Sequence, residues 1–352
     1  MKTRVWTVYL HQRKTTLTEH PAIQEAASRL REGALIAFPT ETVYGLGADA
    51  QNDKAVQSIF RAKGRPGDNP LIVHIGEHSQ LSDIAAHVPS VAEKLMDRFW
   101  PGPLTLVLPS AGTVSDNVTA GLPTVAVRLP EHPVARALLQ VARCPVAAPS
   151  ANRSGRPSPT EARHVLDDLD GRIDGVIDSG PTGYGLESTV LDVTGDEPAL
   201  LRPGGITVEQ LERVLGSVTT DPTLIDNATD RAPRSPGMKY RHYAPQGEMT
   251  LVGGSEGDMV RRIQALADQY RAEGLKVGIL TTEERKEEYR ADVVVACGSR
   301  KALPTVARGL YRALRQFDDA GVERVLAESF PECGWGRTIM NRLRKAAGGR
   351  VI

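Results

Sequence analysis

Short apolar segments, each followed directly by a polar loop, constrain the fold of the first half of this chain more than any other feature. The segments are ALIAF (34–38), LIVHI (71–75), LTLVL (104–108), TVAVRL (124–129) and VAAP (146–149). Their length suits buried strands better than helices, and stretches with helical spacing lie between several of them. Since strands outnumber helices and many are short, we predict a twisted mixed α/β sheet with loops crowding one face.

Three local expectations follow from the same patterns. PTETVYGLGADA (39–50) contains Pro and several Gly and is predicted to be a loop. Residues 79–99 are predicted to form one helical stretch that ends at the breaker WPGP. Thr160 is predicted to cap the helix that follows PSANRSGRPSPT.

The second half of the chain has a different and more regular pattern. MTLVGG, KVGILT, DVVVACG and RVLAESF indicate strands, and helices are expected around 257–273, 283–290, 303–319 and 337–347. This alternation predicts a small Rossmann-like, doubly wound parallel sheet. Residues 216–247 are polar, aperiodic and rich in Pro, as in interdomain linkers. We therefore expect domains at 1–217 and 248–352, joined by a linker at 218–247.

The composition excludes several classes of protein. Lys plus Arg and Asp plus Glu both number 43, which argues against a protein that coats nucleic acid or a membrane surface. The three cysteines are far apart, which argues against a disulfide framework or a cysteine-rich zinc site. The chain shows neither a signal peptide nor an apolar run near the ~18 residues that span a bilayer. We expect a cytoplasmic protein.

The turn RAKGRPGDNP (61–70) brings two cations together just after a helix and just before a strand. Lys63 and Arg65 are well placed there to grip a polyphosphate, because Gly and Pro set the backbone of the turn. The usual nucleotide and hydrolase motifs are missing: the chain contains no GxxxxGK[ST], no HExxH and no GxSxG.

Other hydroxyl, amide and cationic side chains lie in or beside the expected strands, as Lys63 and Arg65 do. They are Thr40, Thr42, His74, Thr124, Arg128, Ser150, Asn152, Ser188 and Arg202. Loops at strand ends converge in α/β sheets, and this set suits an anionic ligand such as a nucleoside triphosphate. Each residue also has a simpler explanation: Arg128 and Arg202 as surface charges, His74 facing solvent, and Ser150 and Asn152 as turn caps.

In this order, the motifs resemble one known family over nearly the whole chain. The motifs are PTETVYGLG, KGRP with NPLIVHI, TVAVRLP, APSAN with SGRPSPT, ESTV, LRPG, SPGMKYRHYAP and ESFPECGWGRTIMNRLRKAA. The first ~210 residues look like the YrdC-like domain. The whole chain resembles the long, two-domain form of L-threonylcarbamoyladenylate synthase.

This resemblance implies a nucleotidyltransferase that joins L-threonine, bicarbonate and ATP, with Mg²⁺, into threonylcarbamoyl-AMP and releases pyrophosphate. Its ATP-binding residues would be Arg65, Asn69, Thr124, Ser150, Ser158, Arg202 and Tyr243, with Tyr240 as an alternative to Tyr243. Its threonine-binding residues would be Thr42, His74, Arg128, Ala148 and Ser188. The KxR/SxN group at the reacting phosphate would be Lys63, Arg65, Ser150 and Asn152.

The resemblance also implies a place in tRNA modification. A tRNA threonylcarbamoyl transferase would pass the group to the adenosine beside the anticodon, and a weak contact of the synthase with tRNA is a further expectation. The linker would close over the nucleotide as a lid. Two alternatives remain at this stage: an RNA-binding module without synthase activity, and a carbamoyl transferase of the hydrogenase-maturation type, whose expected cysteine pairs are not visible here.

Overall fold

The computed structural model describes residues 2–10, 16–222, 224 and 242–352, which divide into two compact units. The second unit holds residues 242–352 together with Gly155–Ser158 and Tyr184–Leu186, and the other described residues form the first unit. No helix in these ranges is long and apolar enough to cross a membrane.

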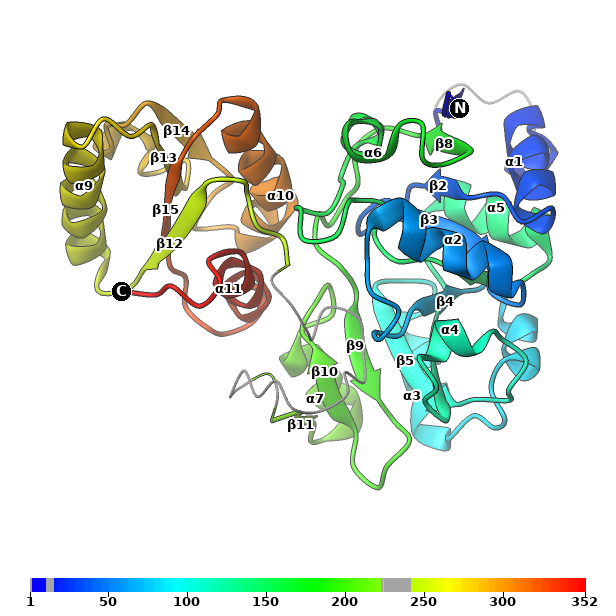
Figure 1. Ribbon diagram of the computed structural model, residues 1–352. Helices are drawn as coiled ribbons and strands as arrows, with labels where there is room; N and C mark the ends of the chain where they lie inside the picture. The colour runs from blue at the N-terminus through cyan, green and yellow to red at the C-terminus, as the bar shows by residue number, and fades with distance from the viewer. Residues whose placement is uncertain (1, 11–15, 223, 225–241) are drawn as a thin grey trace. The chain divides into compact units, whose positions relative to one another are not determined.

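The described part of the first unit is built on a mixed sheet in the order β1-β8-β2-β3-β7-β4-β6-β5-β9-β10-β11 (Figure 1). Its strands are β1 (Arg4–Thr7), β2 (Ile36–Phe38), β3 (Gly45–Asp49), β4 (Ile72–His74), β5 (Leu104–Pro109), β6 (Thr124–Arg128), β7 (Val146–Ala147), β8 (Gly175–Asp178), β9 (Thr189–Asp192), β10 (Ala199–Arg202) and β11 (Thr219–Thr220). Its helices are η1 (Leu17–Glu19), α1 (Pro21–Arg31), α2 (Asp53–Lys63), η2 (His78–Asp83), α3 (Ser90–Phe99), α4 (Asp116–Thr119), α5 (Pro133–Ala142), α6 (Ala162–Leu169) and α7 (Val208–Leu215).

Alternation along the strands separates two apolar layers in the first unit. Ile36 and Phe38 of β2 pack with α1 and α5, which lie side by side in Figure 1. Leu35 and Ala37 point to the opposite face and join a larger core that includes residues of α2, α3, α6 and α7. Because successive strand residues point to opposite faces, each strand can contribute to both layers.

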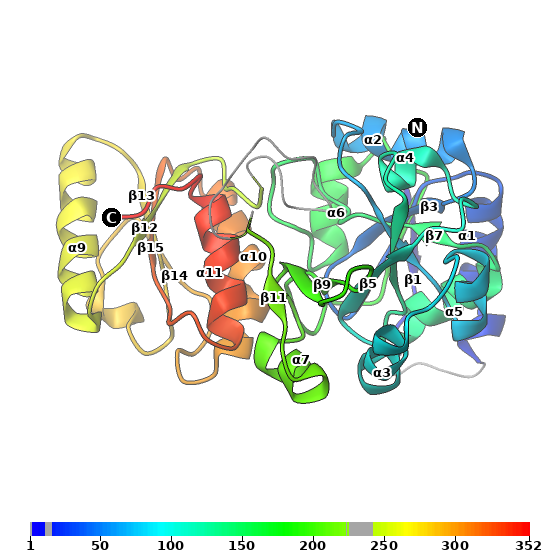
Figure 2. The ribbon, with the colours of Figure 1, turned by 90° about the horizontal axis from the view of Figure 1, so that it is seen from below.

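The second unit contains a parallel sheet in the order β12-β15-β13-β14. Its elements are β12 (Glu248–Val252), α9 (Glu256–Ala272), β13 (Val277–Thr281), η3 (Lys286–Glu288), β14 (Val293–Ala296), α10 (Leu303–Asp319), β15 (Arg324–Glu328) and α11 (Trp335–Ala346). Helix α9 covers one face of this sheet, and α10 and α11 lie against the other (Figure 2). The predicted fold class, a mixed α/β domain followed by a doubly wound parallel domain, is confirmed.

Two of the local expectations are wrong because of how side chains pack in the core. Residues 39–50 do not form a continuous loop, because Gly45–Asp49 is strand β3. A Cβ at Gly47 would lie 2.8 Å from Cε1 of Phe38, so glycine serves close packing here and not a turn. Residues 79–99 are not one helix. Ile84 and Ala85 turn into the core, and Pro89 starts the separate helix α3.

Two expected helix details in the later part of the chain also differ. Helix α6 begins at Ala162 with Glu161 at its N-cap, so Thr160 is not the cap. The stretch 283–290 forms only the short η3, since Tyr289 is its one apolar side chain and provides no stripe for a helix to bury.

A close contact between α10 and the end of β14 gives a test of this packing. A Cβ at Gly309 would lie 1.9 Å from the carbonyl oxygen of Cys297, so Gly309→Ala must displace backbone. We expect a loss of about 1–3 kcal/mol in the free energy of unfolding, which exceeds the ~1 kcal/mol that alanine gains in a helix. Denaturant unfolding of the full-length protein measures this loss.

Gly257→Ala is the matched control. Gly257 lies in the first turn of α9, where an added Cβ meets nothing within 4 Å. This variant should be as stable as the wild type or slightly more stable. Equal unfolding free energies for the two variants would contradict the packing described for α10.

Candidate active site

Strand register places several of the expected polar side chains on one face of the first unit's sheet. His74 of β4 stands directly opposite Arg128 of β6, and opposite Val146 of β7 on its other side. Val146 belongs to the apolar layer that α1 and α5 form, so His74 and Arg128 continue the same sheet face. His74 also meets Phe38 edge-on, with ring centroids 6.1 Å apart.

Arg128 is almost completely buried and is held by three protein acceptors. Its Nε donates to the carbonyl of Gly102 at 3.2 Å, and its Nη1 donates to Oγ1 of Thr42 at 2.9 Å. Its Nη2 forms an ion pair with Glu41. Thr42 is fixed in turn by Thr40, whose hydroxyl lies 2.8 Å from that of Thr42. The alternative explanation of Arg128 as a surface charge is therefore excluded by its 3% exposure.

A second buried arginine is anchored where β9 and β10 approach each other. Arg202 donates from Nε to the backbone carbonyl of Ser188 at 3.0 Å and from Nη2 to its hydroxyl at 3.1 Å. The Ser188 hydroxyl also lies 2.8 Å from that of Thr105 in β5. Sequence-distant strands thus fix the direction of the Arg202 side chain.

His74 lies within the fields of both arginines. Burial is the main cause that lowers its pKa to about 3, and the positive charges of Arg128 and Arg202 lower it further. Its Nδ1 lies 3.3 Å from the carbonyl oxygen of Ile72, which acts in the opposite direction. The imidazole is therefore neutral at physiological pH: its Nδ1–H donates to Ile72, and Nε2 remains as an acceptor for a ligand.

Lys63 connects helix α2 to the loop after β7. Asn52 caps the start of α2 and Gly64 ends it in the left-handed conformation (φ 62°), so that Lys63 is the last helical residue. Its Nζ donates to the carbonyls of Ser150 at 2.5 Å and Asn152 at 2.6 Å. Burial, helped by the charge of Arg65, lowers the pKa of this amine well below its usual range.

The turn after Lys63 is closed by a second cation. Arg65 donates from Nη2 to the carbonyls of Asn69 at 3.0 Å and Pro70 at 3.3 Å, which bends the chain back toward β4. Asn69 is 1% exposed, and its buried Oδ1 accepts no hydrogen bond from the residues that the structure describes. Such an orphaned acceptor is suited to a donor from a ligand.

The backbone of the APSAN segment lies beside these groups. Ala148 donates its amide to the carbonyl of Ile72 at 2.9 Å, and Ser150 forms a β-bridge with Gly45. Ala151 donates to the carbonyl of Tyr44 at 2.8 Å. Ala148 therefore lies beside the start of β4, two residues before His74, and the segment continues from there to Ser150 and Asn152 at the Lys63 amine.

Three expected residues lie elsewhere in the described chain. Thr124 is the first residue of β6, at the opposite end of the strand from Arg128, and pairs with Pro109. Ser158 and Tyr243 belong to the second unit. There Tyr243 stacks on Tyr311 with ring centroids 5.3 Å apart. The alternative residue, Tyr240, lies outside the described residues.

Two buried polar residues of the network are missing from the sequence-based set. Glu41 pairs with Arg128, and Thr105 meets Ser188. Thr105 had a readable signal, because it is the single polar residue in the apolar run LTLVL. Glu41 lies inside PTETVYGLG. It was not selected because the expected ligand is an anion, and a carboxylate repels anions.

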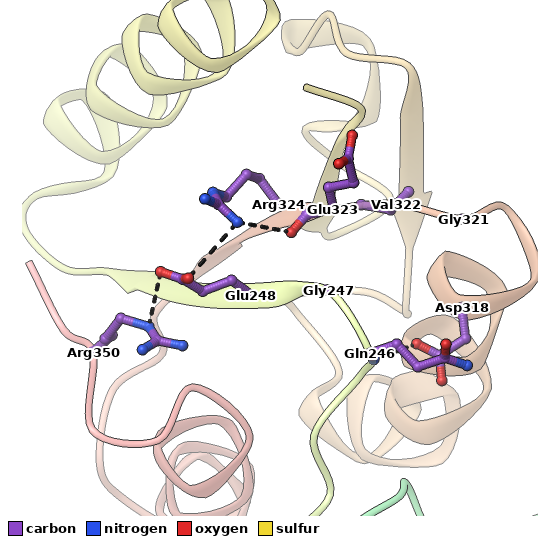
Figure 3. A pocket seen from close by; sticks show the side chains of 9 residues that line it. All are labelled: Gln246, Gly247, Glu248, Asp318, Gly321, Val322, Glu323, Arg324 and Arg350. Carbon is purple, nitrogen blue, oxygen red and sulfur yellow. Dashed lines mark hydrogen bonds and ion pairs between the residues drawn. The ribbon is translucent and has the colours of Figure 1, made fainter. Parts of the chain in front are cut away.

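The second unit contains a polar cavity of about 510 Å³ at the amino ends of β12 and β15. Both of its arginines are paired with one carboxylate: Glu248 lies 3.7 Å from Arg324 and 3.4 Å from Arg350 (Figure 3). Ligands of doubly wound sheets bind at the carboxyl ends of the strands, so this cavity is a poor candidate for an active site.

Two family models match the chain, one after the other. Residues 28–204 match the Sua5/YciO/YrdC family model, described as "Telomere recombination". Residues 206–348 match the model described as "Threonylcarbamoyl-AMP synthase, C-terminal domain". The comparisons do not support the alternative of an RNA-binding module.

Curated relatives and a solved structure match over nearly the full length. The chain is 55% identical to the threonylcarbamoyl-AMP synthase of Bacillus subtilis, with all of both chains covered. It is 49% identical to that of Pyrococcus abyssi, over 94% of this chain and 95% of the relative. It also matches the crystal structure of P. abyssi Sua5 complexed with L-threonine, with a TM-score of 0.93, 47% identity and 99% of both chains covered.

The chain therefore belongs to the threonylcarbamoyl-AMP synthase family of enzymes, in the form that carries both the Sua5/YrdC-type domain and the C-terminal domain.

Proposed function

We propose that the first unit condenses L-threonine, bicarbonate and ATP into threonylcarbamoyl-AMP and pyrophosphate, and that the polar network on its sheet performs this reaction. The observation that carries the proposal is that two buried polar residues, Arg128 and His74, stand side by side on one sheet face, with the charges of Arg128 and of the buried Arg202 both lowering the pKa of His74. It is supported by the family membership and by the relative whose structure was solved with L-threonine.

The threonine subsite would be formed by Arg128, His74, Thr42, Ala148 and Ser188. A guanidinium has five N–H donors, and the protein engages three of them in Arg128. The remaining two can receive the carboxylate of the amino acid. The neutral His74 offers the threonine hydroxyl a buried polar partner, and such pairing discriminates strongly against a side chain without the hydroxyl.

The ATP subsite would be formed by Arg65, Asn69, Thr124, Ser150, Ser158, Arg202 and Tyr243. Thr124 and Arg128 share a sheet face because they are four residues apart in β6. At ~3.3 Å per residue they are roughly 13 Å apart, a span that an elongated nucleotide can bridge. The unpartnered Oδ1 of Asn69 would accept a hydrogen bond from a ribose hydroxyl or the adenine amine.

The chemistry needs positioning and charge neutralisation more than a tuned base. The threonine amine and bicarbonate give a carbamate, whose oxygen attacks the α-phosphate while pyrophosphate leaves. Lys63, Arg65, Ser150 and Asn152 would surround that phosphate. The phosphate charge favours the protonated form of Lys63, which offsets the effect of burial on its pKa.

A magnesium ion would enter with the nucleotide. Within residues 2–10, 16–222, 224 and 242–352, no group of three or more His, Cys, Asp or Glu side chains is arranged to hold a metal. The nearby cations also favour an ion held by phosphate oxygens and water over one held by the protein. When bound, such an ion neutralises charge on the departing pyrophosphate.

The product would be a reactive mixed anhydride, which must be protected from water and passed on to a second enzyme. We propose that a tRNA threonylcarbamoyl transferase uses it to modify the adenosine beside the anticodon, in the cytoplasm, with at most a weak contact between the synthase and tRNA. We also propose domains at 1–217 and 248–352, with the linker 218–247 as a lid that keeps water from the anhydride. The buried Tyr243 is a described residue of that segment.

Replacement of Arg65 tests the phosphate role. Arg65→Ala should lower threonine-dependent pyrophosphate release by about 10²–10³-fold, the usual effect of removing one preorganised charge-stabilising group. Arg61→Ala is the matched control, because Arg61 is exposed in the last turn of α2, the helix that ends just before Arg65. Full activity of Arg65→Ala, or an equal loss in both variants, would argue against the phosphate role of Arg65.

The neutral state of His74 gives a prediction about pH. Its folded-state pKa of about 3 lies below the ordinary value near 6.5, so the unfolded chain binds the proton more readily. The stability that this difference provides is present above pH 6.5 and is lost as the pH falls toward 3. Between pH 7 and pH 4, the free energy of unfolding of the wild type should fall by a few kcal/mol more than that of His74→Gln. The expected slope is about 1.4 kcal/mol for each pH unit between the two pKa values.

Unfolding free energies of both proteins across this range test the prediction. The NMR resonances of the His74 ring should also show no protonation between pH 8 and pH 5. Titration of that ring near pH 6, or parallel stability curves for the two proteins, would show that His74 is not buried in the neutral form.

A further inference from the structure

Glu41 has one carboxylate oxygen that the described protein leaves without a partner. Glu41 stands in the chain between Thr40 and Thr42, whose hydroxyls lie 2.8 Å apart, and the residue is 7% exposed. Oε1 forms the ion pair with Arg128, whereas Oε2 is buried and accepts no hydrogen bond from any described residue. Proteins rarely leave a buried charged oxygen unpaired, because it has lost its water without gaining a donor.

The charges around Glu41 narrow the choice of donor. The charge of His132 also interacts with Glu41, but burial lowers the pKa of His132, so it supplies no positive partner at neutral pH. Arg128 already uses Oε1 and has two further donors that no described residue engages. The pair therefore presents two donors next to an unused anionic acceptor. This pattern matches an α-amino acid, whose carboxylate and ammonium share one carbon.

We propose that Oε2 of Glu41 binds the α-ammonium of L-threonine, and that Glu41 thereby makes the site select an amino acid over the corresponding hydroxy acid. The proposal rests on the function proposed above and adds to it the residue that recognises the reacting nitrogen. Arg128 and Glu41 act together: the arginine binds the carboxylate of threonine and the glutamate binds its ammonium.

The same contact provides a route for the proton that the reaction must remove. The ammonium transfers one proton to Oε2, which leaves the lone pair of the amine free. That lone pair forms the N–C bond with bicarbonate, which loses hydroxide, and the hydroxide leaves as water with a second proton from nitrogen. The carbamate carries one negative charge, and Glu41 returns its proton to solvent, so that atoms and charges balance.

A comparison of two ligands and three proteins tests the proposal. The ligands are L-threonine and the 2,3-dihydroxybutanoate of the same configuration, which has a hydroxyl in place of the ammonium. The proteins are the full-length wild type, Glu41→Gln and the control Glu131→Gln, which makes the same chemical change at an exposed position three residues after Arg128. Calorimetric titration measures the dissociation constant of each pair.

The wild type and Glu131→Gln should both bind threonine about tenfold or more tightly than the hydroxy acid, as expected for one charge-assisted hydrogen bond. Glu41→Gln should lose that preference, with threonine binding weakened and hydroxy-acid binding nearly unchanged. The maximal rate of threonine-dependent pyrophosphate release should also fall in Glu41→Gln, since the proton acceptor is gone.

Three outcomes would overturn the proposal. If both ligands weaken equally in Glu41→Gln, Glu41 serves only to hold Arg128. If the wild type binds the hydroxy acid as tightly as threonine, no group recognises the ammonium; this measurement needs no variant and is independent of how Glu41→Gln folds. If the wild type binds neither ligand and releases no pyrophosphate, the proposed function fails together with this inference.

Discussion

The buried ion pair between Arg128 and Glu41 is the interaction on which the proposed site depends. An arginine at the end of β6 has lost nearly all of its hydration, and a lone buried cation costs several kcal/mol. Glu41, together with the Gly102 carbonyl and the Thr42 hydroxyl, offsets that cost. Because each charge compensates the other, the loss of either would leave an uncompensated charge in the core.

Two parts of one sheet surface handle charge in different ways. In the proposed site, the charges of protein and ligand would cancel around Arg128, because an ion pair would face a zwitterion. Around Lys63 and Arg65 the protein is positive, and burial lowers the pKa of the lysine. A polyphosphate bound there would supply the missing negative charge and favour the protonated amine. This difference would allow the two proposed subsites to distinguish an amino acid from a nucleotide.

The sequence supports correct predictions wherever a local pattern has one structural solution. Helix α10, for example, begins at Leu303 and ends at Asp319, where its periodicity predicts. Prediction of local structure is wrong where one residue type is compatible with two different structures. The glycines of GLGAD look like turn residues, but Gly47 is required because the side chains of Phe38 and Val146 fill the space of a Cβ. Glu41 was missed because its role appears only beside Arg128.

The sequence by itself determined the chemistry: which side chains follow which strands, the order of the motifs and the family they indicate. The tertiary structure decided which of these groups meet. Glu41 and Arg128 are 87 positions apart, and Thr105 and Ser188 are 83 apart. Periodicity describes neighbours a few residues away, whereas these contacts arise only when strands pair in one register and bury their polar ends together. That register turns separate motifs into one surface with a defined charge pattern.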